Sequence, residues 1–242
     1  MRKWCVAVVV WLGFAAAAAA SDWGYTGAEG PEHWGELAPE FATCETGRLQ
    51  SPFDIRADIT ADLSPIVFNY GRVALYVENT GHTLQVNTAS ENRIEVDRVS
   101  YELLQFHFHT PSEHLIAGER FPMALHLVHR SAEGAYAVVG VMLDYGDENP
   151  AIAALWTAAS PEPGESRADG LADLNDLLPV DRRYYRFMGS LTTPPCTEGI
   201  NWHMMAEPVT VSRAQVAAFQ AIFPMNARPL QPENNRLVVS AR

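Results

Sequence analysis

The chain has 242 residues, of which 48% are hydrophobic and 19% are charged, and its formal net charge is −12 at pH 7. This length fits one large domain, and the apolar content is sufficient for one core. Strong acidity without a basic stripe argues against nucleic acid and anionic membranes as partners. The sequence has no internal repeat and no change of composition that would mark a second domain.

Residues 1–20 are predicted to form a secretory signal peptide. Arg2 and Lys3 form a short basic segment, residues 4–14 are apolar, and an alanine tract ends before a predicted cleavage site near Ser21. An uncleaved membrane anchor is the alternative, but the apolar run is shorter than the about 20 residues that a membrane span needs. We therefore expect an exported protein, periplasmic or secreted, whose mature domain is residues 21–242 and carries no membrane anchor.

The cysteines agree with export. Cys5 lies in the predicted signal peptide, which leaves Cys44 and Cys196 in the mature chain. An even pair of cysteines in an oxidising compartment favours a disulfide. Two free buried thiols are the alternative.

After an irregular N-terminal arm at residues 23–44, short apolar segments alternate with Gly, Asn and Asp. Such segments are typical of strands, which we expect at residues 63–68, 73–78, 84–87, 93–96, 100–109, 124–130, 136–144, 184–187, 201–206 and 209–211. Fewer helices are expected, at residues 150–159, at 171–178, and from the cap Ser212 to 222. Residues 160–170 are predicted to be a polar loop. The pattern indicates a sheet-dominated single domain.

The sequence Gln-Phe-His-Phe-His at residues 105–109 carries the strongest chemical signal. In a strand, His107 and His109 share one face, because successive side chains point to opposite sides. A neighbouring strand that brings His126 to the same face completes three imidazoles, the ligand set of a catalytic zinc site with one open position. The Gln105 amide could orient a ligating imidazole. Histidines that are simply satisfied on a polar face are the alternative.

Glu113, in Thr-Pro-Ser-Glu-His at residues 110–114, is open to three interpretations. A Glu shortly after His-x-His also suits the cupin metal motif, so Glu113 could be a metal ligand. It could equally be a carboxylate that acts on the site through a neighbouring residue. A solvated loop charge is the third interpretation.

The sequence Gly-Ser-Leu-Thr-Thr-Pro-Pro at residues 189–195 is not easily explained by structure alone. The two prolines force an extended backbone and restrict the threonines before them. A rigid Thr192 hydroxyl that donates its single proton to a carboxylate must accept the proton of a metal-bound hydroxide, and this orients the hydroxide toward a substrate. A simple turn is the alternative.

These motifs, together with Gly-Pro-Glu-His-Trp at residues 30–34 and the segments 50–55 and 226–232, resemble those of the α-class carbonic anhydrases. The resemblance extends from Trp23 to Gln231, and details of residues 110–114 and 194–196 are similar to the bacterial exported branch. It implies a mainly β fold, an α+β roll, in one domain. Its large, twisted, mostly antiparallel sheet would have about ten strands with short peripheral helices.

The resemblance also implies the catalytic roles. His107, His109 and His126 match the zinc ligands, Thr192 matches the gatekeeping hydroxyl, and Glu113 matches its hydrogen-bond acceptor.

His82, in Asn-Thr-Gly-His at residues 79–82, falls where the family keeps its proton shuttle. An ordinary histidine pKa of about 6.5 suits that task, although an exposed loop histidine would be the favoured interpretation without the family.

Gln105 and Asn226 match positions that orient the ligands. The positions that order pocket water match Tyr25, Thr80 and Gln85. Val128, Val138, Leu191 and Trp202 match the apolar wall that holds carbon dioxide. Thr193 matches the threonine beside the reacting carbon. Cys44 and Cys196 match the disulfide of the bacterial branch.

The implied activity is the zinc-dependent, reversible hydration of carbon dioxide to bicarbonate and a proton, by attack of a zinc-bound hydroxide. In carbonic anhydrases, bound zinc lowers the pKa of water to about 7. The family also implies binding of anion and sulfonamide inhibitors, and it allows a homodimer. Two other hypotheses stay open: a carbonic-anhydrase-like binding module without catalysis, and a cupin-type metal protein with His107, His109 and Glu113 as ligands.

Ala124 departs from the family pattern. A glutamate normally stands two residues before the third ligand, on the same strand face, and accepts a hydrogen bond from its imidazole. Losing such a partner typically costs about 10–100-fold in metal affinity or activity. We therefore expect a zinc site that loads and empties quickly, or one in which water or a backbone carbonyl replaces the carboxylate.

Overall fold

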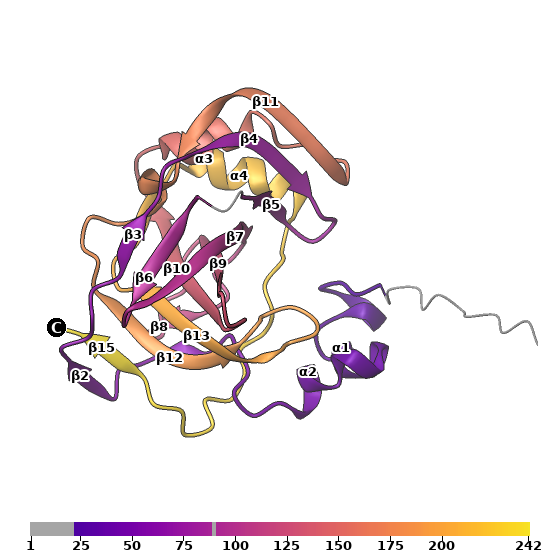
Figure 1. Cartoon of the computed structure of the whole chain (residues 1–242). Helices are drawn as coiled ribbons and strands as arrows, with labels where there is room; N and C mark the ends of the chain where they lie inside the picture. The colour runs from indigo at the N-terminus through magenta and orange to yellow at the C-terminus, as the bar shows by residue number, and fades with distance from the viewer. Residues whose placement is uncertain (1–21, 89–90) are drawn as a thin grey trace, which may run out of the picture.

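One large twisted sheet dominates the computed structural model, which describes residues 22–88 and 91–242 (Figure 1). The predicted signal peptide, residues 1–20, lies outside the described residues. Within the described part, the main sheet has 13 strands. They are β2 (Ile59–Ala61), β3 (Val67–Asn69), β4 (Arg72–Asn79), β5 (Leu84–Asn87), β6 (Arg93–Val96), β7 (Val99–His109), β9 (Met123–Ser131), β10 (Tyr136–Tyr145), β11 (Gly164–Asp173), β12 (Tyr184–Ser190), β13 (Glu198–Met205), β14 (Val209–Val211) and β15 (Val239–Ala241).

The strands follow the order β11-β4-β5-β7-β9-β10-β13-β12-β15-β2, with β14 beside β10 and with β6 between β3 and β7. Most pairs are antiparallel, whereas β10 runs parallel to β13 and β14, and β15 runs parallel to β2. A separate two-stranded sheet joins β1 (Asp54–Ile55) to β8 (Leu115–Ile116). The predicted mainly β fold with short peripheral helices is confirmed.

The helices are short. They are α1 (Trp34–Leu37), α2 (Thr43–Thr46), α3 (Pro150–Trp156) and α4 (Arg213–Ile222), with 3-10 turns η1 (Gly27–Glu29), η2 (Pro39–Phe41) and η3 (Leu174–Leu177). In the described part of the chain, no helix combines the length and the apolar character needed to cross a bilayer.

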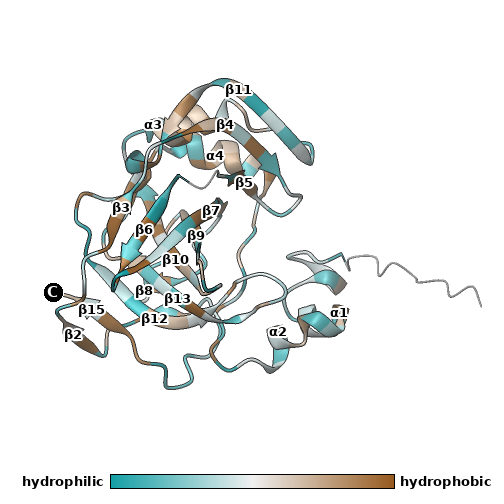
Figure 2. Cartoon of the chain, in the orientation of Figure 1, coloured by the Kyte–Doolittle hydropathy of each residue, from teal (hydrophilic) through white to brown (hydrophobic). Residues whose placement is uncertain are grey.

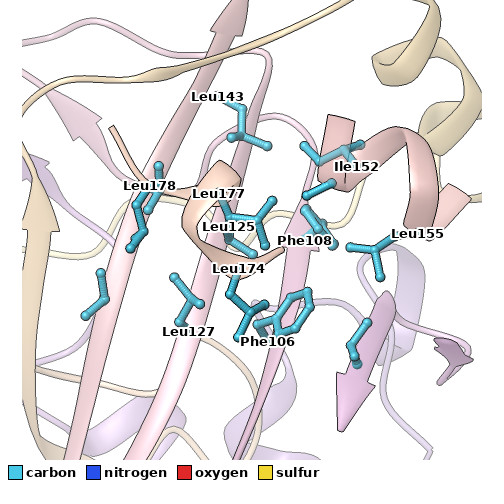
Figure 3. Packing of buried hydrophobic residues seen from close by; sticks show 14 of the residues in the cluster. Phe106, Phe108, Leu125, Leu127, Leu143, Ile152, Leu155, Leu174, Leu177 and Leu178 are labelled. Atoms are coloured by element: carbon cyan, nitrogen blue, oxygen red, sulfur yellow. The ribbon is translucent and has the colours of Figure 1, made fainter. Parts of the chain in front are cut away.

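The main core lies against one face of the central strands β7 and β9 (Figure 3). Phe106 and Phe108 point into it from β7, and Leu125 and Leu127 point into it from β9; all four are fully buried. Each such side chain contributes about 1.5–3 kcal/mol of hydrophobic stabilisation. The covering side chains from α3 and η3 include Ile152, Leu155, Leu174 and Leu177. Because side chains alternate along a strand, the residues between these core residues face the other side of the sheet.

Side-chain caps and one buried amide fix the covering helices α3 and α4. The Asn149 side chain accepts a hydrogen bond from the Ile152 N–H at 3.0 Å and so caps α3. Ser212 and Gln215 form a reciprocal capping box at the start of α4. The buried Gln215 side chain also bonds the backbone N–H and C=O of Asn149, at 3.0 and 2.7 Å. One glutamine thus locks the two helices together over the core.

Two regions differ from the expectation. Residues 164–170 of the predicted polar loop (160–170) and residues 171–173 of the predicted helix (171–178) form the edge strand β11, which pairs with β4 and is mostly hydrophilic (Figure 2). Only η3 of that helix forms, as a 3-10 turn. Most side chains of β11 are exposed, so this strand lacks the apolar alternation that predicts strands. The N-terminal arm, expected to be irregular, contains the short helices α1 and α2.

Candidate metal centre

Three histidines converge on the face of the sheet opposite the main core. His107 and His109 alternate with the buried phenylalanines on β7, and His126 lies directly across from His107 on β9. One ring nitrogen of each residue lies within 4.8 Å of the corresponding nitrogens of the other two. The group can hold a metal ion, because neutral imidazoles at this spacing can share one tetrahedral ion.

Hydrogen bonds at the outer nitrogens orient two of the imidazoles. His107 Nδ1 lies 2.8 Å from Gln105 Oε1, and His109 Nδ1 lies 2.8 Å from the backbone oxygen of Asn226. Oxygen acceptors at Nδ1 require the proton there, so Nε2 of both rings carries a lone pair toward the cluster. Burial lowers the pKa of His107 and of His126 well below the ordinary value, which keeps both rings neutral.

His126 lacks such an outer partner. Its Nδ1 lies on the cluster side, 3.8 Å from Glu113 Oε2. Its Nε2 is buried, and no described residue forms a hydrogen bond with it. Ala124, which precedes it on the same face of β9, is 1% exposed and pairs with His109 in the strand register. The residue that departs from the family pattern, Ala124, is therefore buried beside a histidine whose Nε2 has no hydrogen-bond partner among the described residues.

Glu113 is buried beside the cluster and is not the solvated loop charge that the sequence left open. Its Oε1 accepts the backbone N–H of Arg228 at 2.9 Å, and its Oε2 lies 3.4 Å from His109 Nε2. Burial raises the pKa of the Glu113 carboxyl, while His109, Arg228 and the nearby Thr192 hydroxyl oppose that rise. Thr192 is 4% exposed, so the threonine and the carboxylate occupy one dry corner of the site.

A cavity of about 260 Å³ opens from the histidines. Its polar end holds His107, His126, Thr192 and Thr193. Its apolar wall contains the four residues predicted from the family, which are Val128, Val138, Leu191 and Trp202.

Leu104 and Tyr136 also line this cavity and were missed from the sequence. Tyr136 could have been found, because it lies two residues before Val138 and so shares its strand face. Leu104 had no such signal, because a register irregularity between Leu103 and Gln105 brings it to the rim.

A second, polar cavity of about 220 Å³ shares Gln105, His107 and Thr193 with the first. The predicted water-ordering residues Tyr25, Thr80 and Gln85 line it together with His82. The His82 ring stacks on Trp23 with centroids 3.8 Å apart. This partial burial lowers the pKa of His82, against an opposing effect of Asp22. The cluster therefore has an apolar cavity on one side and a polar route toward His82 on the other.

Cys44 and Cys196 form the predicted disulfide across a sequence separation of 152 residues. It joins α2 to the segment that follows Thr192 and Thr193. Trp34 packs against the disulfide in a small apolar cluster. The covalent link therefore anchors the N-terminal arm beside the metal centre.

Known proteins share this architecture. The α-carbonic anhydrase of Thermovibrio ammonificans, solved in complex with the inhibitor sulfanilamide, superposes with a TM-score of 0.88 at 43% identity, over 91% of this chain and 100% of that chain. A carbonic anhydrase of Nostoc sp. is 44% identical over 227 residues, which are 91% of this chain and 86% of the relative. Another, from Klebsiella pneumoniae, is 45% identical over 225 residues and 91% of both chains.

A model of the eukaryotic-type carbonic anhydrase family matches residues 29–242. That range contains the three histidines, the buried glutamate beside them and all residues that line the apolar cavity. Fold, sequence and site geometry agree over almost the whole described chain, and the protein therefore belongs to the eukaryotic-type, or α-class, carbonic anhydrase family.

Proposed function

We propose that this protein is a zinc enzyme that catalyses the reversible hydration of carbon dioxide to bicarbonate and a proton. The observation that carries the proposal is the cluster of His107, His109 and His126 at the end of a cavity with an apolar wall. Three neutral nitrogens and no thiolate suit zinc, and an open fourth position is the mark of a catalytic zinc site.

The three histidines would hold the ion through Nε2 of His107, Nε2 of His109 and Nδ1 of His126. Zinc bound there supplies Lewis-acid activation of water at neutral pH. Gln105 and the Asn226 backbone oxygen orient two of the rings and keep their inner nitrogens unprotonated.

The remaining residues select and orient the reactants. Carbon dioxide has no charge and no dipole, so it favours the dry wall formed by Val128, Val138 and Trp202. The Thr192 hydroxyl, beside the buried Glu113, donates its proton to the carboxylate and presents its lone pairs to the attacking oxygen species. Orientations of the oxygen species that would need a hydrogen-bond donor at Thr192 are therefore disfavoured.

His82 is the group that would carry the proton to solvent. It lies on the polar cavity that also contains His107, and its ring is only half-buried. Burial lowers the pKa of His82 from its ordinary value, so the ring is neutral at neutral pH and can accept a proton. Tyr25, Thr80 and Gln85 line the space between and can order the water through which a proton moves.

Zinc analysis and carbon dioxide hydration measured on the same preparation test this function. We expect about one zinc per chain and a hydration rate that falls to the uncatalysed level in His126→Ala. His33→Ala, which removes an exposed histidine that lines neither cavity, is the matched control and should leave both zinc and rate unchanged.

Two outcomes would contradict the proposal. Zinc-free, inactive native protein would indicate a binding module of the same fold. Metal that persists in His126→Ala but is lost in Glu113→Ala would indicate a cupin-type ligand set instead.

Two expectations accompany this function. Aromatic sulfonamides should bind in the apolar cavity, because the Thermovibrio ammonificans relative is solved with sulfanilamide. Export to the periplasm or the medium is supported by the Cys44–Cys196 disulfide, since disulfides persist in oxidising compartments.

A further inference from the structure

Besides Nε2 of His109, which faces the cluster, three ring nitrogens near the metal centre are buried without a hydrogen-bond partner among the described residues. They are Nε2 of His126 and both nitrogens of His114. The exposed fractions of these residues are 2% and 0%. Buried polar groups almost always find a partner, and a group left without one costs free energy. Because two such imidazoles lie side by side, we infer that one hydrogen-bonded connection satisfies both of them.

The two rings lie close together against one tryptophan. The centroids of His114 and His126 are 6.3 Å apart. Both rings pack edge-on against Trp202, at 4.8 and 4.9 Å. A centroid separation of 6.3 Å is too long for a direct hydrogen bond between two imidazoles, so a bond between these rings needs one bridging water molecule.

The other aromatic neighbours of His126 cannot serve as its acceptor. The Trp202 indole has only a donor, which already bonds the Ser190 oxygen at 3.0 Å. The outer nitrogens of His107 and His109 are taken by Gln105 and Asn226. Among the aromatic rings packed around His126, only His114 is left with a free lone pair.

Ala124 explains why such an acceptor is needed. It precedes His126 by two residues on the same strand face, and its methyl group accepts no hydrogen bond. When Nδ1 of His126 faces a metal ion, its Nε2 must carry the proton and becomes a buried donor.

We propose that His114 is a positioning residue for the metal centre, which accepts the hydrogen bond of His126 Nε2–H through one bridging water. The inference rests on the proposed function, because it requires a metal on the other nitrogen of His126. A neutral acceptor reached through water holds the ligand less firmly than a carboxylate, since hydrogen bonds to charged groups are about twice as strong. Zinc release is therefore faster than in Ala124→Glu.

The test is a double-mutant cycle on the rate of zinc loss to an excess of a chromogenic chelator. His114→Phe keeps the ring shape against Trp202 but removes the acceptor, so it should release zinc about 10-fold faster than the native protein. In the Ala124→Glu background, where the new carboxylate accepts the bond, the same change should alter the rate by less than about 2-fold. Equal effects in both backgrounds would mean a purely structural role and would overturn the proposal.

A conservative variant and an NMR signal distinguish the loss of the hydrogen-bond acceptor from misfolding of His114→Phe. His114→Gln retains a polar acceptor and should release zinc within about 3-fold of the native rate. In NMR spectra of the zinc-loaded protein, the His126 Nε2 proton should exchange with solvent more slowly in the native chain than in His114→Phe. Native exchange already as fast as in His114→Phe would also overturn the proposal.

The two hypotheses fail in different ways. Native protein that holds no zinc would refute the proposed function. Native protein that holds one zinc, but loses it no faster after His114→Phe, would refute only the role of His114.

Discussion

The histidines of the centre differ in the hydrogen-bond partner of the outer ring nitrogen. His107 and His109 have oxygen acceptors that select the tautomer, whereas His126 has an alanine where a carboxylate would be expected. His82 differs again, because its ring is half-buried by stacking on Trp23 rather than held by a hydrogen bond at a ring nitrogen within the described residues. In the proposed function, the same residue type would thus serve as a metal ligand or as a proton carrier, according to its immediate neighbours.

The stacking predicts how His82 responds to pH. Burial lowers its pKa below 6.5, so the ring stays neutral, and able to accept a proton, to lower pH than a free imidazole. Trp23→Ala exposes the ring, raises its pKa toward the ordinary value, and should move the acid limb of the hydration rate to higher pH. An NMR titration of the His82 ring protons would measure the shift directly.

Tyr76→Ala, which removes an exposed aromatic from β4, is the control and should not alter that titration. An unchanged His82 midpoint in Trp23→Ala would contradict this explanation of the pKa.

At the scale of elements, the register of β7 and β9 creates the centre. His107 pairs with His126 while Phe106 pairs with Leu127, so one face carries the histidine cluster and the other face carries the core. A slip of one residue would turn His126 into the core and bring an apolar side chain to the metal face. The helices α3 and α4 hold this register indirectly, because they cover the apolar face that a slip would expose.

The start of α4 offers a test at this scale. Ser212→Ala removes the oxygen that accepts the Gln215 N–H, and should lower the free energy of unfolding by about 1 kcal/mol. Ser212→Thr keeps a hydroxyl oxygen and should lose much less. Urea unfolding monitored by circular dichroism would measure both. A zinc content that changes with Ser212→Ala would contradict the view that α4 acts on stability alone.

In the whole molecule, distant segments meet behind the metal centre. The buried Arg228 guanidinium donates to the backbone oxygens of Cys44 and Ser51 and to the Gln50 side chain, all at 2.8 Å. Its own backbone N–H holds Glu113. Burial lowers the pKa of Arg228 to about 10, so it remains charged at neutral pH. One arginine and the disulfide therefore connect the N-terminal arm, the Thr192 segment and the C-terminal segment.

The disulfide should contribute strongly to global stability. Replacing both Cys44 and Cys196 by alanine should lower the free energy of unfolding by about 2–5 kcal/mol, because the link restricts the unfolded chain over 152 residues. Urea titration with and without a reducing agent would check this. The reducing agent should destabilise the native protein but not the variant in which both cysteines are alanine. An equal effect on that variant would contradict the prediction.

The sequence allowed most of the sheet and the site to be predicted, because strand alternation is a local property. His107 and His109 share a face in any regular strand, and the phenylalanines between them mark the core side. Edge strand β11 and the short β2 and β15 were missed, because they bury too little to leave an apolar pattern. Leu104 was missed because a local register irregularity, not its sequence, carries it to the cavity.

The sequence by itself determined the residue types and their local order: two histidines on one strand, a third on an apolar strand, two cysteines and a rigid Thr-Thr-Pro-Pro segment. Only the tertiary structure decided which nitrogen of each imidazole faces the cluster, that Glu113 is buried rather than solvated, and that His114 lies beside the unpaired nitrogen of His126. These facts depend on contacts between residues far apart in the chain. Hydrogen-bond partners and burial belong to the packed molecule and not to any local segment.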